Sequence, residues 1–243
     1  MRVALISDIH GNEVAFAAVA TDLERLNLDA CVCLGDVAQG GPQPAEVVRR
    51  LRSLDCPVVM GNSDGFLLEV PTDSPEPITQ QHLEVREWTL SRLSEEDLQW
   101  IRSFPPVVEA TIEPGTRLFA FHGSPRSFDD VLLPWSSEDA ASPFRDSDAD
   151  LLAGGHTHTQ WARRLDGALY VNPGSIGLAY DHHQPADDFR LTPVAEYAVV
   201  TGGGGEPRVE YRRVPYSLAE LADVIRSSGR PHAESFERQW WGT

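Results

Sequence analysis

The chain has 243 residues, of which 41% are hydrophobic, and a formal net charge of −17. A chain of this length and composition can bury the core of one α/β domain without disulfides to stabilise it. Because no basic run offsets the negative charge, the sequence argues against a general nucleic-acid-binding protein and against binding to anionic membranes.

The first predicted strand, Val3 to Ile6, ends in a carboxylate and an imidazole, Asp8 and His10. In extended backbone, side chains two residues apart point the same way, so we expect these groups to converge on one point, as metal ligands do. An Asp-x-His segment alone is short and common, and an incidental strand end also explains it. Its meaning therefore depends on whether the pattern recurs.

Two helices are predicted to alternate with the next strands. Asn12 can cap the first helix, which continues with apolar residues at helical spacing, and Pro44 is a suitable first residue for the second. Residues 30–34 form the strand between them, and Cys56-Pro57 opens a third strand. This alternation predicts a parallel sheet.

Residues 65–106 interrupt the alternation with a predicted helical insertion, marked at its start by Pro71, Pro75 and Pro77. One helix is expected from about His82 to Arg92, and a second after the capping box that begins at Ser94. Such an insertion shapes a substrate entrance in some proteins and is only a packing appendage in others. His82 is retained as a catalytic candidate, although a lone histidine is more often structural.

The C-terminal half reads as a series of hairpins followed by a helix. Turns at Glu113–Thr116, at Asp166-Gly167 and in the glycine run 202–205 each separate two apolar strands, which predicts a second, largely antiparallel sheet. Residues 124–148 are loop-rich and are expected to lie over the site. A capping box at Ser217 begins a last helix, and the tail with Trp240-Trp241 is expected to pack on the protein itself or on another subunit.

The pattern at Asp8 recurs four times, because other apolar runs also end in ligand-type residues beside glycine: Asp36, Asn62, His122, and the pair His156 and His158. Ligands in α/β sheets bind beyond the carboxyl ends of the strands, so these residues are expected to form one site. The oxygen and nitrogen donors, with no thiolate, suit manganese, iron, zinc or nickel. They are too many for one tetrahedral ion, and two ions sharing Asp36 is the simplest arrangement.

In this order, the segments Asp8-Ile9-His10, Gly35-Asp36, Gly61-Asn62, His122-Gly123 and Gly155-His156-Thr157-His158 resemble the signature of the calcineurin-like metallophosphoesterases. The similarity is closer to the small bacterial and archaeal phosphodiesterase branch. The resemblance implies a four-layer αββα sandwich of two mixed sheets. It also implies that one metal is held by Asp8, His10 and His158, the other by Asn62, His122 and His156, and that Asp36 bridges them.

Two departures from the family pattern bear on the activity. Many relatives continue Gly-Asn with His-Glu, where this chain has Ser63-Asp64. A serine is a poor general acid, which favours esters with good leaving groups, while Asp64 is expected to orient His10 through its other nitrogen. The Asp-Arg-Gly continuation of the protein phosphatases is replaced by Val37-Ala38-Gln39, which favours a phosphodiester over a phosphoprotein.

The sequence thus predicts a single metallophosphoesterase domain over residues 1–243, with an insertion at about 65–106 and a C-terminal helix and tail at about 216–243. We expect a dinuclear hydrolase acting on small phosphodiesters or nucleotides, with manganese as the first choice of metal and metal-bridging hydroxide attacking phosphorus in line. The alternative is a phosphatase-fold binding or scaffold protein with vestigial catalysis. An α/β protein with unrelated histidines would require five coincidences.

The remaining expectations concern the protein's surroundings. The three cysteines read as buried thiols of a reducing compartment, and the sequence shows neither a signal segment nor an apolar run of membrane-spanning length. We therefore expect a soluble cytoplasmic protein that binds a small phosphoester or nucleotide, and neither nucleic acid in general nor membranes. His182 and His183 are expected in solvent, and the oligomeric state is left open.

Overall fold

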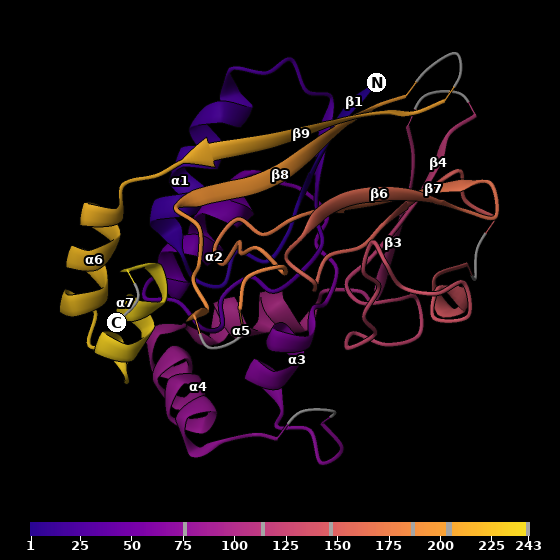
Figure 1. Ribbon diagram of the computed structural model, residues 1–243. Helices are drawn as coiled ribbons and strands as arrows, with labels where there is room; N and C mark the ends of the chain where they lie inside the picture. The colour runs from indigo at the N-terminus through magenta and orange to yellow at the C-terminus, as the bar shows by residue number, and fades with distance from the viewer. Residues whose placement is uncertain (75–76, 113–114, 146–147, 186–187, 203–205, 242–243) are drawn as a thin grey trace.

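Two mixed β-sheets pack face to face in the computed structural model, which describes residues 1–243 except 75–76, 113–114, 146–147, 186–187, 203–205 and 242–243 (Figure 1). The first sheet has the strand order β2 (Ala30–Cys33), β1 (Arg2–Ile6), β8 (Val194–Thr201), β9 (Arg208–Pro215). The second has the order β3 (Val107–Thr111), β4 (Arg117–Phe121), β5 (Leu151–Ala153), β7 (Ala168–Pro173), β6 (Gln160–Leu165). The predicted α/β fold with two mixed sheets is confirmed.

The central strand β1 is buried on both faces, which explains its continuous apolar run. Val3 and Leu5 pack against the second sheet, whereas Ala4 and Ile6 face the helices that cover the first sheet. Alternate side chains of one strand thus enter two different cores. The core that contains Val3 and Leu5 holds the two sheets together.

Helices α1 (Glu13–Glu24) and α2 (Pro44–Ser53) cover the outer face of the first sheet, as predicted. The Asn12 side chain caps α1 by accepting a hydrogen bond from Ala15 N, and Pro44 opens α2. Strands β1 and β2 are parallel, with Ile6 opposite Cys33. The predicted third strand is reduced to one parallel bridge between Cys33 and Val58.

The late strands divide between the two sheets, so the predicted second antiparallel sheet is wrong in its membership. β8 and β9 pair with each other but extend the first sheet, where β8 lies antiparallel to β1. β6 and β7 form the predicted hairpin at Asp166-Gly167, and both turn residues have the positive φ of a tight hairpin turn. The turn residues 113–114 and 203–205 lie outside the described residues. Sequence periodicity indicates hairpins but carries no information on which sheet a hairpin joins.

The insertion contains α3 (Asn62–Leu68), α4 (Gln80–Arg92) and α5 (Glu95–Arg102), of which α3 was not predicted. Thr79 caps α4, and Ser94 and Asp97 form the predicted reciprocal cap of α5. Pro75 lies outside the described residues. Because α3 begins at Asn62, the insertion starts directly at a predicted metal ligand.

The C-terminal residues form α6 (Leu218–Ser227) and α7 (Ala233–Trp241), which pack on each other. Phe236 and Trp240 are buried, and Trp240 Nε1 donates a hydrogen bond to the Tyr216 hydroxyl at 2.8 Å. The expectation that the tail packs on the protein itself is confirmed for Trp240, whereas the side chain of Trp241 lies outside the described part of the chain. Among the described residues, no helix is both long enough and apolar enough to span a membrane.

The described residues of the loop-rich segment 124–148 cover the outer face of the second sheet and include one short 3-10 helix, Ser142–Arg145. Leu132, Ala141 and Phe144 pack there against the sheet. These residues form the outer layer on this side of the sandwich, and Phe128, Asp129 and Val131 line a cavity at the predicted site.

Candidate metal centre

The structure brings all seven predicted ligands together beyond the carboxyl ends of the strands. Two follow β1, one follows β2, one opens α3, one follows β4 and two follow β5: Asp8 and His10, Asp36, Asn62, His122, and His156 and His158. Segments far apart in the chain therefore meet at one edge of the sandwich.

Three of these residues form a first group. His158 Nε2 lies 3.3 Å from Asp8 Oδ1 and 3.1 Å from His10 Nε2. His10 Nε2 is 3.5 Å from Asp36 Oδ2, which places the Asp36 carboxylate at the edge of this group.

The other three form a second group on the opposite side of Asp36. Asn62 Oδ1 lies 2.9 Å from His122 Nε2 and 3.1 Å from His156 Nδ1. His122 Nε2 is 3.4 Å from Asp36 Oδ2, so one carboxylate oxygen is close to both groups.

Backbone carbonyls orient three of the imidazoles. The Nδ1 atoms of His10, His122 and His158 lie 3.0, 2.6 and 2.9 Å from carbonyl oxygens of residues 39, 34 and 178. A carbonyl only accepts hydrogen bonds, so each Nδ1 must carry a proton and each Nε2 faces the centre, where it offers a lone pair when the imidazole is neutral. His156 is turned the other way and presents Nδ1.

The atoms that face the centre are therefore almost all acceptors. Asp8 Oδ1 is buried and, within the described part of the chain, accepts no hydrogen bond. Lone pairs at such short separations repel one another, and burying an unpaired carboxylate oxygen is costly. A cation removes both penalties, and oxygen and nitrogen donors without thiolates fit a divalent transition metal.

The backbone at the centre is strained. The φ angles are 54° at Asp8, 48° at His10, 57° at Asp36, 68° at His156 and 52° at His158. The left-handed region is uncommon for residues other than glycine and costs about 1–3 kcal/mol per residue, and such strain is concentrated at functional sites. The expectation that Asp8 and His10 converge through extended backbone is wrong, because two left-handed residues bring them together instead.

Comparison with known proteins agrees with this geometry. Residues 1–192 match the calcineurin-like phosphoesterase superfamily domain. The chain belongs to this superfamily. Membership places it among phosphoesterase hydrolases in general.

Similar proteins span nearly the whole chain. The crystal structure of a metallophosphoesterase from Sphaerobacter thermophilus is 28% identical, covers 98% of each chain and has a TM-score of 0.75. A hypothetical protein from Pyrococcus horikoshii is 20% identical, covers 98% of this chain and 97% of its own, has a TM-score of 0.82, and shows a common fold. An uncharacterized protein of Methanocaldococcus jannaschii is 27% identical over 91% of this chain and 83% of its own length.

Asp64 has a different contact from the one predicted for this phosphoesterase. Its Oδ2 accepts hydrogen bonds from Asp36 N at 2.8 Å and Gly61 N at 3.2 Å, and its Oδ1 accepts one from Val37 N at 2.9 Å. The prediction that it orients His10 is wrong, since the second nitrogen of His10 faces a carbonyl. Asp64 fixes the backbone of Asp36. Burial, followed by the charge of Asp36, raises the pKa of Asp64 to about 7.

Ser63 supports the same carboxylate from the other side. Its hydroxyl donates to Asp36 Oδ2 and its backbone N–H donates to Asp36 Oδ1, both at 2.8 Å. Sequence reasoning treated Ser63 only as a missing histidine. In the structure, this residue positions the carboxylate that lies between the two groups.

The remaining histidines lie away from the ligand groups. His82 is in the first turn of α4, where its Nδ1 accepts from Thr79 N at 3.4 Å, and it lines a cavity beside the centre. His183 is exposed, as expected. The expectation for His182 is wrong, because it is half-buried with Nε2 2.6 Å from the Thr157 carbonyl oxygen.

Electrostatics at the centre favour anionic carboxylates. Burial raises the pKa of Asp36, but the nearby His122 and His10 outweigh it and hold that pKa well below its usual range. Burial lowers the pKa of His122, but the Asp36 and Asp8 carboxylates raise it to about 10. Burial and the charge of His122 lower the pKa of His156 to about 4. Near neutral pH, a proton on His122 therefore competes with any cation.

Metal binding should release protons. A divalent cation must displace the proton of His122, so we expect the release of about one proton per chain near neutral pH and an affinity that rises with pH toward the pKa of His122. Titration calorimetry with Mn²⁺ in two buffers of different ionisation enthalpy measures the release. Heats that are the same in both buffers would contradict the expectation.

Gly61→Ala should lower the metal content. A Cβ on Gly61 would overlap Asp36 Oδ1 and the Asp36 backbone nitrogen, so the carboxylate must move. Gly65→Ala is the matched control, because a Cβ there meets nothing within 4 Å. We expect the first variant to lose most of its bound metal by elemental analysis and the second to retain it. Equal metal contents would show that the position of Asp36 is not critical.

Proposed function

We propose that the protein is a dinuclear metal-dependent phosphoester hydrolase that acts on small phosphodiesters or nucleotides. The observation that carries this proposal is the position of Asp36 Oδ2, which is 3.5 Å from His10 Nε2 in one ligand group and 3.4 Å from His122 Nε2 in the other. A carboxylate can span two cations, and two-metal sites are typical of phosphoester hydrolysis.

The proposal assigns the first group, Asp8, His10 and His158, to one ion and the second, Asn62, His122 and His156, to the other. Asp8 Oδ1 lies 3.9 Å from His10 Nε2 and 4.0 Å from His122 Nε2, so both carboxylates face the space between the groups. Oxygen and imidazole donors suit manganese first, with iron, zinc or nickel as alternatives.

Two ions held by these groups would lower the pKa of a coordinated water and supply positive charge for the phosphoryl oxygens. The residues of this chain supply the geometry. Asp64 and Ser63 fix Asp36, and the carbonyl-held imidazoles keep their lone pairs on the centre. Asp64 therefore acts through Asp36 and does not contact the reacting atoms.

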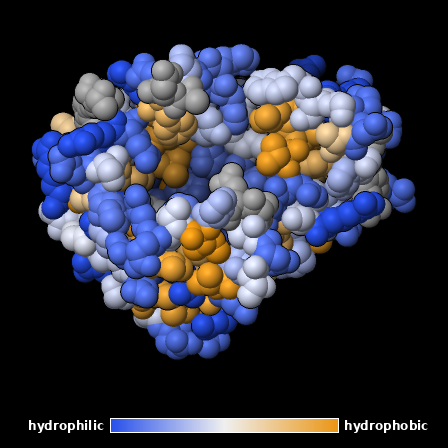
Figure 2. All heavy atoms as spheres, turned by 60° about the horizontal axis from the view of Figure 1, so that its bottom comes forward, coloured by the Kyte–Doolittle hydropathy of each residue, from blue (hydrophilic) through white to orange (hydrophobic). Residues whose placement is uncertain are grey.

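The substrate preference follows from two features. A cavity of about 660 Å³ beside the centre fits a small molecule, and the hollow is visible in Figure 2. Ser63 lines this cavity where many relatives have a histidine that assists the leaving group, and a serine is a poor acid. These features support small diesters with good leaving groups as substrates.

The proposed partners and cellular location follow from the net charge of the chain and from its cysteines. Its net charge of −17 supports a small anionic substrate held by local cations and argues against general nucleic-acid or membrane binding. Cys31, Cys33 and Cys56 are free, which supports a cytoplasmic location.

Metal content and turnover test the proposal together. Protein purified without chelator should contain about two ions per chain and hydrolyse bis(para-nitrophenyl) phosphate with added Mn²⁺. Asp36→Asn should lower kcat at least about a hundredfold, because the amide cannot bridge two cations as an anion. Full metal content without turnover would instead favour the scaffold alternative, and little metal would exclude the dinuclear centre.

Replacement of Ser63 tests the leaving-group argument. Ser63→His should raise kcat about tenfold or more on alkyl esters, which are poor leaving groups, and change little on para-nitrophenyl esters. Ser63→Ala is the control, since it removes the hydroxyl bonded to Asp36 without adding an acid. An unchanged rate of Ser63→His on alkyl esters would show that position 63 does not set the leaving-group preference.

A further inference from the structure

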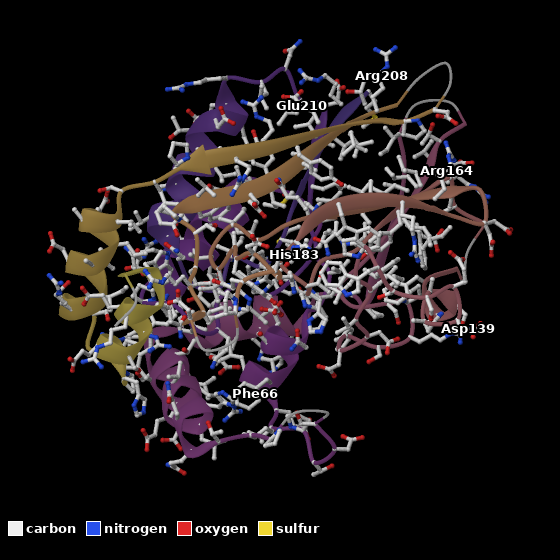
Figure 3. The ribbon with its side chains drawn as sticks, in the orientation of Figure 1. Phe66, Asp139, Arg164, His183, Arg208 and Glu210 are labelled. Atoms are coloured by element: carbon white, nitrogen blue, oxygen red, sulfur yellow. The ribbon has the colours of Figure 1, made fainter. Side chains whose placement is uncertain are left out.

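The cavity beside the metal centre is bounded by segments that have no part in holding the metal. Its walls include Phe66 on α3, which is labelled in Figure 3. Ile78 before α4, and Phe128 and Val131 of the loop over the second sheet, also line it. One further wall comes from Arg230, between α6 and α7. Arg230 lies beyond residue 192, where the match to the superfamily domain ends.

Arg230 is held in a fixed position at this wall. It is 8% exposed, and its Nε donates to the Gly40 carbonyl at 2.6 Å while its Nη1 donates to the Pro231 carbonyl at 2.7 Å. The guanidinium lies over the Phe236 ring, 4.0 Å from its centroid. A planar cation fixed in this way is preorganised to bind an anion with its remaining N–H groups.

No carboxylate pairs with Arg230 among the residues that the structure describes, and Nη2 has no protein hydrogen-bond partner there. Burial lowers the pKa of this arginine to about 10, so it remains charged near neutral pH. A buried charge without a counter-charge is costly and is seldom retained without a partner. The sequence makes this cation more notable, because the chain of net charge −17 has no lysine.

Arg230 and the metal centre share the same cavity. Gly40, whose carbonyl accepts from Arg230, lies against the His10 ring, where a Cβ would be 3.7 Å from Nδ1. His10, Asn62 and His156 line the cavity together with Arg230. A single small molecule in this cavity can therefore contact both the metal ligands and the guanidinium.

The other contacts of the C-terminal segment fix its position on α4. Arg92 donates to the Ser228 carbonyl at 2.7 Å, and His232 Nε2 lies 2.7 Å from Glu84 Oε2. These residues do not line the cavity, so they hold the segment without contacting a bound molecule.

We propose that Arg230 binds a second anionic group of the substrate, a phosphate or a carboxylate, while the scissile phosphoester lies at the metal centre and the apolar part between them lies against Phe66, Ile78 and Phe128. This inference rests on the proposed hydrolase function and narrows its substrate class. The substrate is a phosphoester that carries an additional anion on an organic group of nucleoside size.

Binding tests the inference independently of turnover. Calorimetry of the Mn²⁺-loaded protein compares thymidine monophosphate with the thymidine bisphosphate that carries a phosphate on each sugar hydroxyl. A parallel pair, phenyl phosphate and para-carboxyphenyl phosphate, distinguishes a carboxylate from a second phosphate. We expect the doubly anionic member of at least one pair to bind about thirtyfold more tightly. Equal affinities within both pairs would overturn the inference.

Variants assign the effect to Arg230. Arg230→Gln should remove the preference, with less than about a threefold effect on the singly anionic ligand, and Arg230→Lys should retain part of it as a point charge. Arg238→Gln is the matched control and should retain the full preference, because Arg238 is an exposed arginine of α7 that pairs with Glu234 and does not line the cavity. A preference that survives in Arg230→Gln would overturn the assignment, and circular dichroism with metal content shows whether each variant is folded.

The two proposals fail in different ways. Absence of phosphodiester turnover in a metal-loaded protein that still prefers doubly anionic ligands would overturn the hydrolase proposal and leave the anion site intact. Turnover without this preference would overturn only the anion site.

Discussion

Two buried carboxylates that face the same space determine the organisation of this protein. Asp8 and Asp36 are 0% and 2% exposed, and both lie within 4.0 Å of His10 Nε2. Like charges buried this close together destabilise the fold unless a positive charge lies between them. Imidazoles that are held by backbone carbonyls and directed at the centre complete the site. A cation stabilises such a site, whereas an apolar residue would not.

The backbone around these carboxylates is fixed from several directions, which is what allows five ligand residues to keep left-handed conformations. Asp8 N donates to the Gly35 carbonyl at 3.0 Å and His10 N to the Asp36 carbonyl at 2.9 Å, so the pairing of β1 with β2 continues past the strand ends. The Ser175 hydroxyl and Gly177 N both donate to the Asp8 carbonyl. Strained backbone persists only where such contacts over-determine it.

The convergence of the ligands was predictable from sequence because it depends on a general rule, that parallel strands end at one edge of a sheet. The left-handed φ angles at Asp8 and His10 were not predictable, since neither residue type requires them. The partners of Asp64 were also not predicted, because family analogy assigned this residue to His10. Its hydrogen bonds to three backbone N–H groups depend on α3, and residues 62–68 show no helical periodicity that predicts this helix. Contacts between distant segments, such as β8 with β1 or Arg230 with Gly40, leave no local pattern.

The position of Arg230 connects these points to the charge of the whole chain. An acidic protein repels an anionic substrate at long range, so binding requires short-range cations in a site where water is scarce and electrostatic attraction is strong. The ligand groups suit metal ions, and Arg230 places one fixed cation at the wall of the same cavity. The metal ligands all precede residue 192 and Arg230 follows it, so this cation comes from outside the part of the chain that matches the superfamily domain. In the proposed substrate complex, the C-terminal segment contributes a cation to substrate binding without supplying a metal ligand.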